Sequence, residues 1–353
     1  MIEQFFRSYL IAYLFWLGVA LGCLPLLMLH HLVGGTWGFV IRRILEAGTR
    51  TLPLMLLLFV PLLFGLHSLY AWSHSDLVAR DAVLQAKRVY LNVPFFVVRA
   101  GIYFVAWIVF AWLLNRWSME QDETGNPSLI RRFQLLSGPG IVVYSLAVTF
   151  ASIDWAMSLE PHWFSTIYGF LFIVGQALAA LSFVIAVAVR LSDSPPLSQF
   201  VKADVFQDLG NLLLAFVMLW AYIAFSQYLI IWAGNLPEEI PWYLRRGTGG
   251  WQWVAAFLAL FHFAVPFVLL LGRGNKRNKE FLGRIAIAVL VMRWVDVYWL
   301  IAPSFVSNVR IYVLDVLLFA FTGGIWFYVF WGQLMKRPVL PLRDPNFVVE
   351  RVA

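Results

Sequence analysis

Charge is scarce in this sequence. Only 13% of its 353 residues are charged and 61% are hydrophobic, whereas a typical soluble domain is about a quarter charged. No segment is both long enough and polar enough to form a separate soluble domain. These shortages exclude an ordinary soluble globular protein and predict an integral membrane protein.

Cysteine is almost absent as well, because Cys23 is the single example. One thiol cannot form an internal disulfide, hold an iron–sulfur cluster or attach a c-type haem through a CxxCH motif. We therefore expect no metal site in this chain. Any haem or iron–sulfur cluster that works with it is expected to lie on a partner subunit.

The charge that is present is mostly basic and gives a net charge of +7. The basic residues lie between apolar runs, so the positive-inside rule accounts for them and no nucleic-acid partner is predicted. Most of them fall on the side of the C-terminus, including Arg42, Arg43 and Arg50 in the loop expected after the first apolar run. This distribution predicts a multi-pass protein of the bacterial inner membrane, with its N-terminus outside and its C-terminus in the cytoplasm.

Long apolar runs dominate the rest of the chain. A helix needs roughly 20 apolar residues to cross the hydrocarbon, and these runs lack the alternation of a strand. The predicted spans are Tyr9–Leu32, Thr51–Trp72, Pro94–Asn115, Leu136–Met157, Ser165–Arg190, Gln207–Ala233, Gly249–Leu271, Leu282–Ile301 and Ile311–Leu334. The fold class is therefore all-α and polytopic, with about nine transmembrane helices. The mixed segment Ser73–Asn92 predicts an interfacial helix.

A weak internal repeat indicates how the spans are grouped. Asp154 and Asp296 each lie seven residues before a proline, near the outer ends of the fourth and eighth spans. This spacing suggests two four-helix bundles in parallel repetition plus one extra helix. The expected units are an N-terminal helix with its inner loop (1–50), a first bundle (51–190), a second bundle (191–335) and a cytoplasmic tail (336–353).

Ionisable residues inside the spans are the candidates for function. Such a residue costs roughly 2.5–3.5 kcal/mol near the bilayer centre and usually faces the bundle interior. His67, Arg99 and Asp154 fall at one depth toward the outer face. In one interpretation they form a quinol head-group site or a proton relay. Asp154 then accepts a proton, His67 is its hydrogen-bond partner and Arg99 keeps it ionised. In the other interpretation Arg99 and Asp154 form a structural ion pair.

A second polar set lies in the later spans. Arg293 and Asp296 are three residues apart, so they share a helix face. His262 lies in the middle of the seventh span, and Gln227 and Tyr228 lie near the outer end of the sixth. The same two interpretations apply, namely a quinol site or proton path and a simple ion pair.

Three segments together resemble a known family. They are Ser152–Thr166 (SIDWAMSLEPHWFST), Phe261–Phe267 (FHFAVPF) and Met292–Trp299 (MRWVDVYW). They are similar to the ActF family of quinone-binding membrane subunits of alternative complex III, which are relatives of the NrfD-like polysulfide-reductase subunits. The resemblance covers most of the chain and implies ten spans, one more than the sequence predicts.

The resemblance implies a subunit without redox centres in a menaquinol:cytochrome c or blue-copper-protein oxidoreductase. Such a complex works in respiratory or photosynthetic electron transport, with quinol oxidation or proton translocation as this subunit's contribution. The implied ligand is menaquinol. The implied partners are a sister quinol-binding (ActC-like) subunit, an iron–sulfur subunit, a multihaem cytochrome c subunit and lipids. Two rival functions are a purely structural scaffold and a secondary transporter. The transporter is disfavoured because no Gly/Pro-broken spans stand at matching repeat positions.

Overall fold

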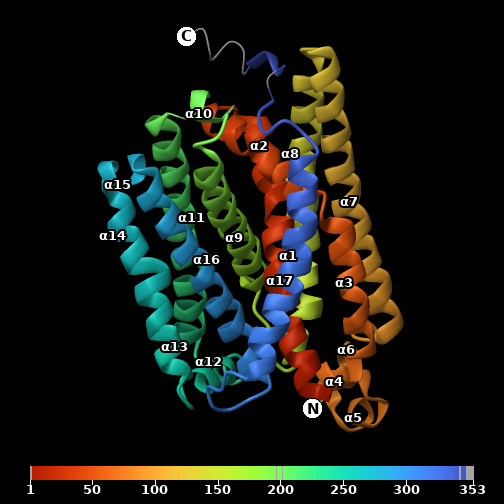
Figure 1. Cartoon of the computed structure of the whole chain (residues 1–353). Helices are drawn as coiled ribbons and strands as arrows, with labels where there is room; N and C mark the ends of the chain where they lie inside the picture. The colour runs from red at the N-terminus through yellow and green to blue at the C-terminus, as the bar shows by residue number, and fades with distance from the viewer. Residues whose placement is uncertain (1, 196, 201, 342, 347–353) are drawn as a thin grey trace.

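The computed structural model describes residues 2–195, 197–200, 202–341 and 343–346, and these residues form helices without strands (Figure 1). Nine helical segments in them are long and apolar enough to cross a membrane. They are α1 (Ile2–Val33), α2 with α3 (Thr36–Thr49, Leu52–Phe64), α7 (Val93–Thr124), α8 with η2 (Ser128–Trp155, Met157–Leu159), α9 (Tyr168–Leu191), α11 (Ala203–Gly234), α13 with η3 and α14 (Trp251–Leu258, Ala259–Ala264, Val265–Leu271), α16 with η4 (Lys279–Ile301, Ala302–Ser304) and α17 (Val313–Met335). The prediction of an all-α polytopic membrane protein is confirmed.

Shorter helices connect the spans. They are α4 (Leu66–Leu69), η1 (Ala71–Ser73), α5 (Ser75–Arg80), α6 (Ala82–Lys87), α10 (Leu197–Phe200), α12 (Ile240–Arg246) and α15 (Arg273–Arg277). The single interfacial helix predicted at Ser73–Asn92 is in fact divided into α5 and α6. The division lies at Asp81, whose carboxylate accepts hydrogen bonds from the backbone N–H groups of Val83 and Leu84 and so begins a new helix.

The second span differs most from its prediction of Thr51–Trp72. It begins with α2 at Thr36, in the segment expected to be an inner loop, and α3 ends at Phe64. The prediction failed because Arg42 and Arg43 were counted as loop charges. Both are 1% exposed and lie on α2, where carboxylates from other elements neutralise them. A hydropathy count cannot anticipate such pairing.

Two helices form the centre of the fold. In their most apolar stretches α1 is 89% buried and α9 is 83% buried, well above the other spans. The helix α1 packs against α2, α8, α9 and α17, and α9 also contacts α11 and α16. The helix predicted as an addition to two bundles therefore contacts spans from both predicted groups. The N-terminus lies at the end with α4, α5, α6 and α12, and the C-terminal segment at the end with α10 and α15 (Figure 1).

The contact between α1 and α9 depends on one glycine of the sequence pair Gly18 and Gly22. A Cβ on Gly22 would lie 2.1 Å from the backbone oxygen of Gln176, whereas a Cβ on Gly18 would lie 3.5 Å from the Gln176 side chain. We expect Gly22→Ala to lower the free energy of unfolding by about 1–3 kcal/mol, because backbone atoms must move apart. Gly18→Ala is the matched control and is expected to leave it unchanged or to raise it slightly. Thermal unfolding of the two purified variants in detergent tests this, and equal melting temperatures would contradict it.

Candidate functional site

The first predicted cluster contains a closed ion pair. Arg99 on α7 donates from Nε to Asp154 Oδ2 (2.8 Å) and from Nη2 to Oδ1 (2.9 Å), and the Tyr103 hydroxyl donates to Oδ2 (2.9 Å). The Arg99 guanidinium also lies 3.8 Å from the Tyr90 ring centre and donates to the Tyr90 carbonyl oxygen. Asp154 is 0% exposed. Both of its oxygens are therefore occupied, which leaves it no obvious place for a substrate.

His67 does not join this cluster, contrary to the prediction. Its side chain is exposed, its Nδ1 lies 3.2 Å from the Ser73 hydroxyl and its ring packs against His74. The reason is local, because α3 ends at Phe64 and His67 belongs to the separate turn α4. Tyr103, which the sequence did not single out, takes the hydrogen-bonding position that was predicted for His67.

The second predicted set borders a large cavity. The cavity has a volume of about 930 Å³ and lies between α11, α12, α13 with η3, and α16. It exists because α11 packs against η3, α14 and α15, while α13 packs against α12 and α16 instead. The span α11 and the span formed by α13, η3 and α14 therefore lie close together at the end of the protein with α15. They lie apart at the opposite end, where α12 is. Most of the wall is apolar and aromatic.

The cavity reaches the lateral surface of the protein. Its lining includes Tyr222, Phe225 and Trp232 of α11, which are 69%, 62% and 67% exposed. Because the described ranges hold nine helices apolar enough to cross a membrane, such exposed aromatic side chains on a span are positioned to meet the hydrocarbon. A ligand dissolved in the lipid can therefore reach the cavity sideways, without passing through water.

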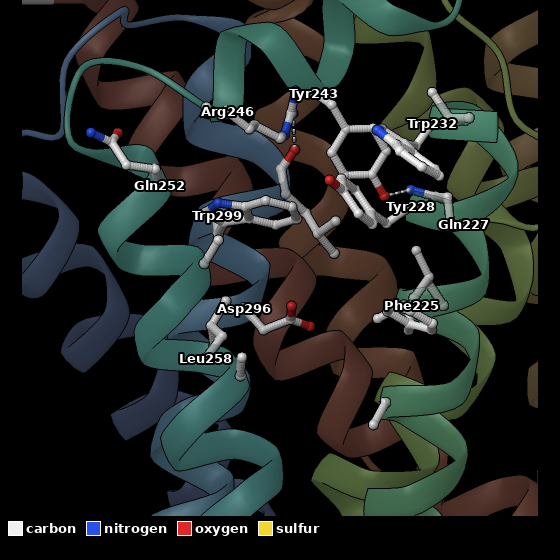
Figure 2. Close-up of a pocket in the computed structure, with 18 of the residues that line it drawn as sticks. Phe225, Gln227, Tyr228, Trp232, Tyr243, Arg246, Gln252, Leu258, Asp296 and Trp299 are labelled. Atoms are coloured by element: carbon white, nitrogen blue, oxygen red, sulfur yellow. Dashed lines mark hydrogen bonds between the residues drawn. The ribbon is translucent and has the colours of Figure 1, made fainter. Parts of the chain in front are cut away.

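Asp296 is the only carboxylate that lines this cavity within the described part of the chain. Its Oδ2 accepts hydrogen bonds from Arg293 and, at 3.2 Å, from Trp220 Nε1. Its Oδ1 accepts none from the described residues. Figure 2 shows the carboxyl group pointing from α16 toward the space between α11 and α13. Asp296 thus differs from Asp154 in having one oxygen available to a ligand.

Arg293 lies behind Asp296, against α9. A Cβ on Gly175 would lie 2.3 Å from Arg293 Nη2, so glycine at this position of α9 makes room for the guanidinium. Arg293 is 4% exposed and Asp296 also 4% exposed. The ion pair predicted from their spacing is therefore present and buried, and its carboxylate member borders the cavity.

His262 is fully buried and lies one layer behind the cavity. Its ring packs edge-on against Trp220 with ring centres 4.2 Å apart, and neither ring nitrogen has a hydrogen-bond partner among the described residues. It lies in η3, a π-helical turn. Pro266 explains that turn, because a proline has no N–H to donate to the carbonyl of His262 four residues earlier. His262 contacts the Asp296 partner Trp220 and does not itself line the cavity.

The roof of the cavity comes from α12, which the sequence did not predict. Gln227 is 1% exposed and donates from Nε2 to the Tyr243 hydroxyl (3.3 Å), and the Ser165 hydroxyl donates to Gln227 Oε1 (3.4 Å). Tyr228 packs against Tyr243 with ring centres 5.3 Å apart. Both residues predicted near the outer end of the sixth span therefore contribute to the cavity wall (Figure 2).

Arg246 fixes this roof in place. It is 2% exposed, its guanidinium lies 3.5 Å from the Trp242 ring centre, and Nη2 donates to the Leu300 carbonyl (2.8 Å). Glu160 accepts hydrogen bonds from Arg246 (3.2 Å) and from the Ser304 hydroxyl (2.7 Å). Glu160 follows η2 at the end of the fourth span and Ser304 ends η4 in the eighth, so the ends of these two spans meet at this arginine. Arg246 lies between the sixth and seventh predicted spans, where a basic residue reads in the sequence as an ordinary loop charge.

A third polar cluster lies at the opposite end of the protein. Glu46 accepts hydrogen bonds from Arg42 (3.0 Å), Arg43 (2.7 Å) and Ser118 (2.6 Å). Arg42 also donates to Asp344 of the C-terminal segment (2.6 Å). The sequence signal was an Arg–Arg pair with a glutamate three and four residues later, which is helical spacing. The cluster links α2, α7 and the C-terminal segment.

No group of three or more His, Cys, Asp or Glu residues suited to a metal ion occurs in the described ranges. Comparison with protein-family models gives no match for the chain, and comparison with curated proteins gives none either.

Proposed function

We propose that this chain is a membrane subunit of a quinol:electron-acceptor oxidoreductase and that it binds the quinol head group in the cavity beside Asp296. One observation carries the proposal. A buried carboxylate, held on one oxygen by Arg293 and Trp220, presents its other oxygen to an apolar cavity that opens toward lipid. The resemblance of the segments around Asp154, His262 and Asp296 to alternative complex III subunits supports the same class of complex.

The cavity has the features that a lipid-soluble ring with polar edges needs. Ligand sites of this type are mostly apolar and have a few placed polar groups. At about 930 Å³ the cavity is at the upper end of the usual range for such sites. Trp220 and Trp299 supply flat faces beside Asp296, and the lateral opening leaves room for an isoprenoid tail.

In this proposal the protein supplies binding and proton acceptance. A quinol gives up two protons and two electrons on oxidation. Asp296 Oδ1 accepts the proton of the hydroxyl that it holds, and the proton of the other hydroxyl passes to water. The electrons pass to a haem or iron–sulfur centre on a partner subunit. The partners are the sister quinol-binding subunit, the iron–sulfur subunit and the multihaem cytochrome c. The N-terminal end, where the cavity lies, is the end at which such a partner docks.

Asp296→Asn tests the proposal. We expect it to weaken binding of a quinol analogue by about ten-fold or more, because a hydrogen bond to a charged acceptor contributes about 1.5–3 kcal/mol. The measurement is quenching of tryptophan fluorescence by 1,4-naphthohydroquinone in the purified full-length chain in lipid nanodiscs.

The matched control is Asp315→Asn. Asp315 is also a buried carboxylate, 3% exposed, but it bonds to Ser8 and does not line the cavity. Equal binding by the wild-type chain and the Asp296→Asn variant, or equal loss in both variants, would remove Asp296 from the site.

A further inference from the structure

The cavity offers a hydrogen-bond acceptor on one side and a donor on another. Asp296 Oδ1 accepts no hydrogen bond from the described residues. The Tyr243 hydroxyl oxygen accepts from Gln227 Nε2, and its own proton has no acceptor in the described part of the chain. Figure 2 shows Tyr243 in the roof, bonded to Gln227, with Asp296 on the wall beneath it.

Each group has one hydrogen-bonding role toward the ligand in this arrangement. Arg293 and Trp220 both donate to Asp296 Oδ2, so the ion pair leaves Oδ1 as the acceptor that faces the ligand. Tyr243 lies outside the spans on α12, and burial raises the pKa of its hydroxyl to about 12. Tyr243 therefore remains a donor at neutral pH, and its oxygen is already engaged by Gln227.

The two groups belong to elements that are joined directly. The roof helix α12 is joined to α16 by the hydrogen bond from Arg246 to the Leu300 carbonyl. Leu300 lies four residues after Asp296, which corresponds to a rise of about 6 Å along the helix. A ring ligand in the cavity therefore meets Asp296 on the wall and Tyr243 in the roof.

We propose that the cavity selects the reduced, dihydroxy form of its ring ligand over the oxidised, dicarbonyl form. This inference rests on the function proposed above and adds which redox form is bound. A quinol hydroxyl can donate to Asp296 Oδ1, while its other oxygen accepts from Tyr243. A quinone has only acceptor oxygens, so a carbonyl facing the carboxylate leaves two acceptors opposed. The Tyr243 end does not discriminate, because both forms accept there.

The test compares 1,4-naphthohydroquinone with 1,4-naphthoquinone. Each is titrated without oxygen into the full-length chain in nanodiscs, and the Kd is obtained from tryptophan quenching. We expect the wild-type chain to bind the hydroquinone on the order of ten-fold more tightly. In Asp296→Asn the ratio is expected to fall to about one or to reverse, since an amide can donate to a carbonyl. In Tyr243→Phe both forms are expected to weaken by a similar factor, with the ratio kept.

Tyr328→Phe is the matched control, because Tyr328 on α17 is 81% exposed, does not line the cavity and makes no side-chain hydrogen bond among the described residues. We expect it to change neither Kd. Equal wild-type binding of the two forms would overturn the redox selectivity and leave the proposed quinol site standing. Absence of binding by either form would overturn both. If Tyr243→Phe abolished the preference in Kd for the hydroquinone while Asp296→Asn kept it, the assignment of the discriminating role to Asp296 would be wrong.

Discussion

Glu46→Ala is expected to lower the free energy of unfolding by about 3–5 kcal/mol, the cost of removing one partner from a buried ion pair. Glu46 is 1% exposed and binds both Arg42 and Arg43, which are also 1% exposed. Without the glutamate, two guanidinium groups remain buried with too little negative charge. The expected readout is a large drop in the yield of folded protein and in its melting temperature in detergent.

Two further variants show whether burial causes this effect. Asp122→Ala removes another carboxylate bound to Arg43, but the Asp122 side chain is 30% exposed, so water can replace it in part. Glu3→Ala removes an exposed partner of Arg7 on α1, and such pairs contribute at most about 1 kcal/mol. We expect the order of destabilisation to be Glu46→Ala, then Asp122→Ala, then Glu3→Ala. A Glu46→Ala variant as stable as Glu3→Ala would show that the cluster is not a stability determinant.

Asp154→Ala is expected to cost a similar 3–5 kcal/mol, because it leaves Arg99 buried without its carboxylate. Arg99 is 6% exposed and would keep only the Tyr90 carbonyl and the neighbouring aromatic rings as partners. Unlike Asp296→Asn, this change is expected to leave the Kd for a quinol analogue unchanged in the molecules that remain folded. Thermal unfolding and the binding titration, made on the same preparation, separate the two effects.

The double variant Arg99→Met with Asp154→Leu distinguishes a structural pair from a catalytic one. Apolar replacement of both members of a buried pair is often neutral for stability or better. We therefore expect the double variant to recover most of the stability that Asp154→Ala loses, with unchanged ligand binding. A stable double variant that no longer supports quinol oxidation by the assembled complex would return Asp154 to the catalytic site.

The sequence predicted the spans well where hydropathy alone decides them. Eight of the nine overlap all or most of their predicted ranges, because a run of about 20 apolar residues has few alternatives to crossing the bilayer. Five of the eight agree within four residues at both ends, while the first, third and fourth spans each extend seven to nine residues further at one end. The exception is the span that starts at Thr36, where Arg42 and Arg43 were taken for loop charges. The Arg293–Asp296 pair was also predictable, since residues three apart on a helix share a face.

The depth of a residue along its span was a poorer guide to which side chains cluster than the spacing of residues on one helix face. His67, Arg99 and Asp154 were grouped by depth, but one turn of chain at Gly65 moves His67 out of the group. Tyr103 could have been found in the sequence, because it lies four residues after Arg99 and so on the same helix face. Tyr243 and Arg246 gave no usable signal, since a connecting segment has no periodicity that fixes its contacts.

Low charge, long apolar runs and a single cysteine determined by themselves that the chain is a helical membrane protein, because the bilayer accepts few other solutions for such a composition. Only the tertiary structure decided which buried carboxylate can meet a ligand. Asp154 and Asp296 stand in similar sequence contexts, seven residues before a proline. Arg99 and Tyr103 from a neighbouring helix occupy both oxygens of Asp154, whereas the separation of α11 from α13 leaves one oxygen of Asp296 facing a cavity. The distance between two helices is set by all the side chains packed between them, and no local pattern records it.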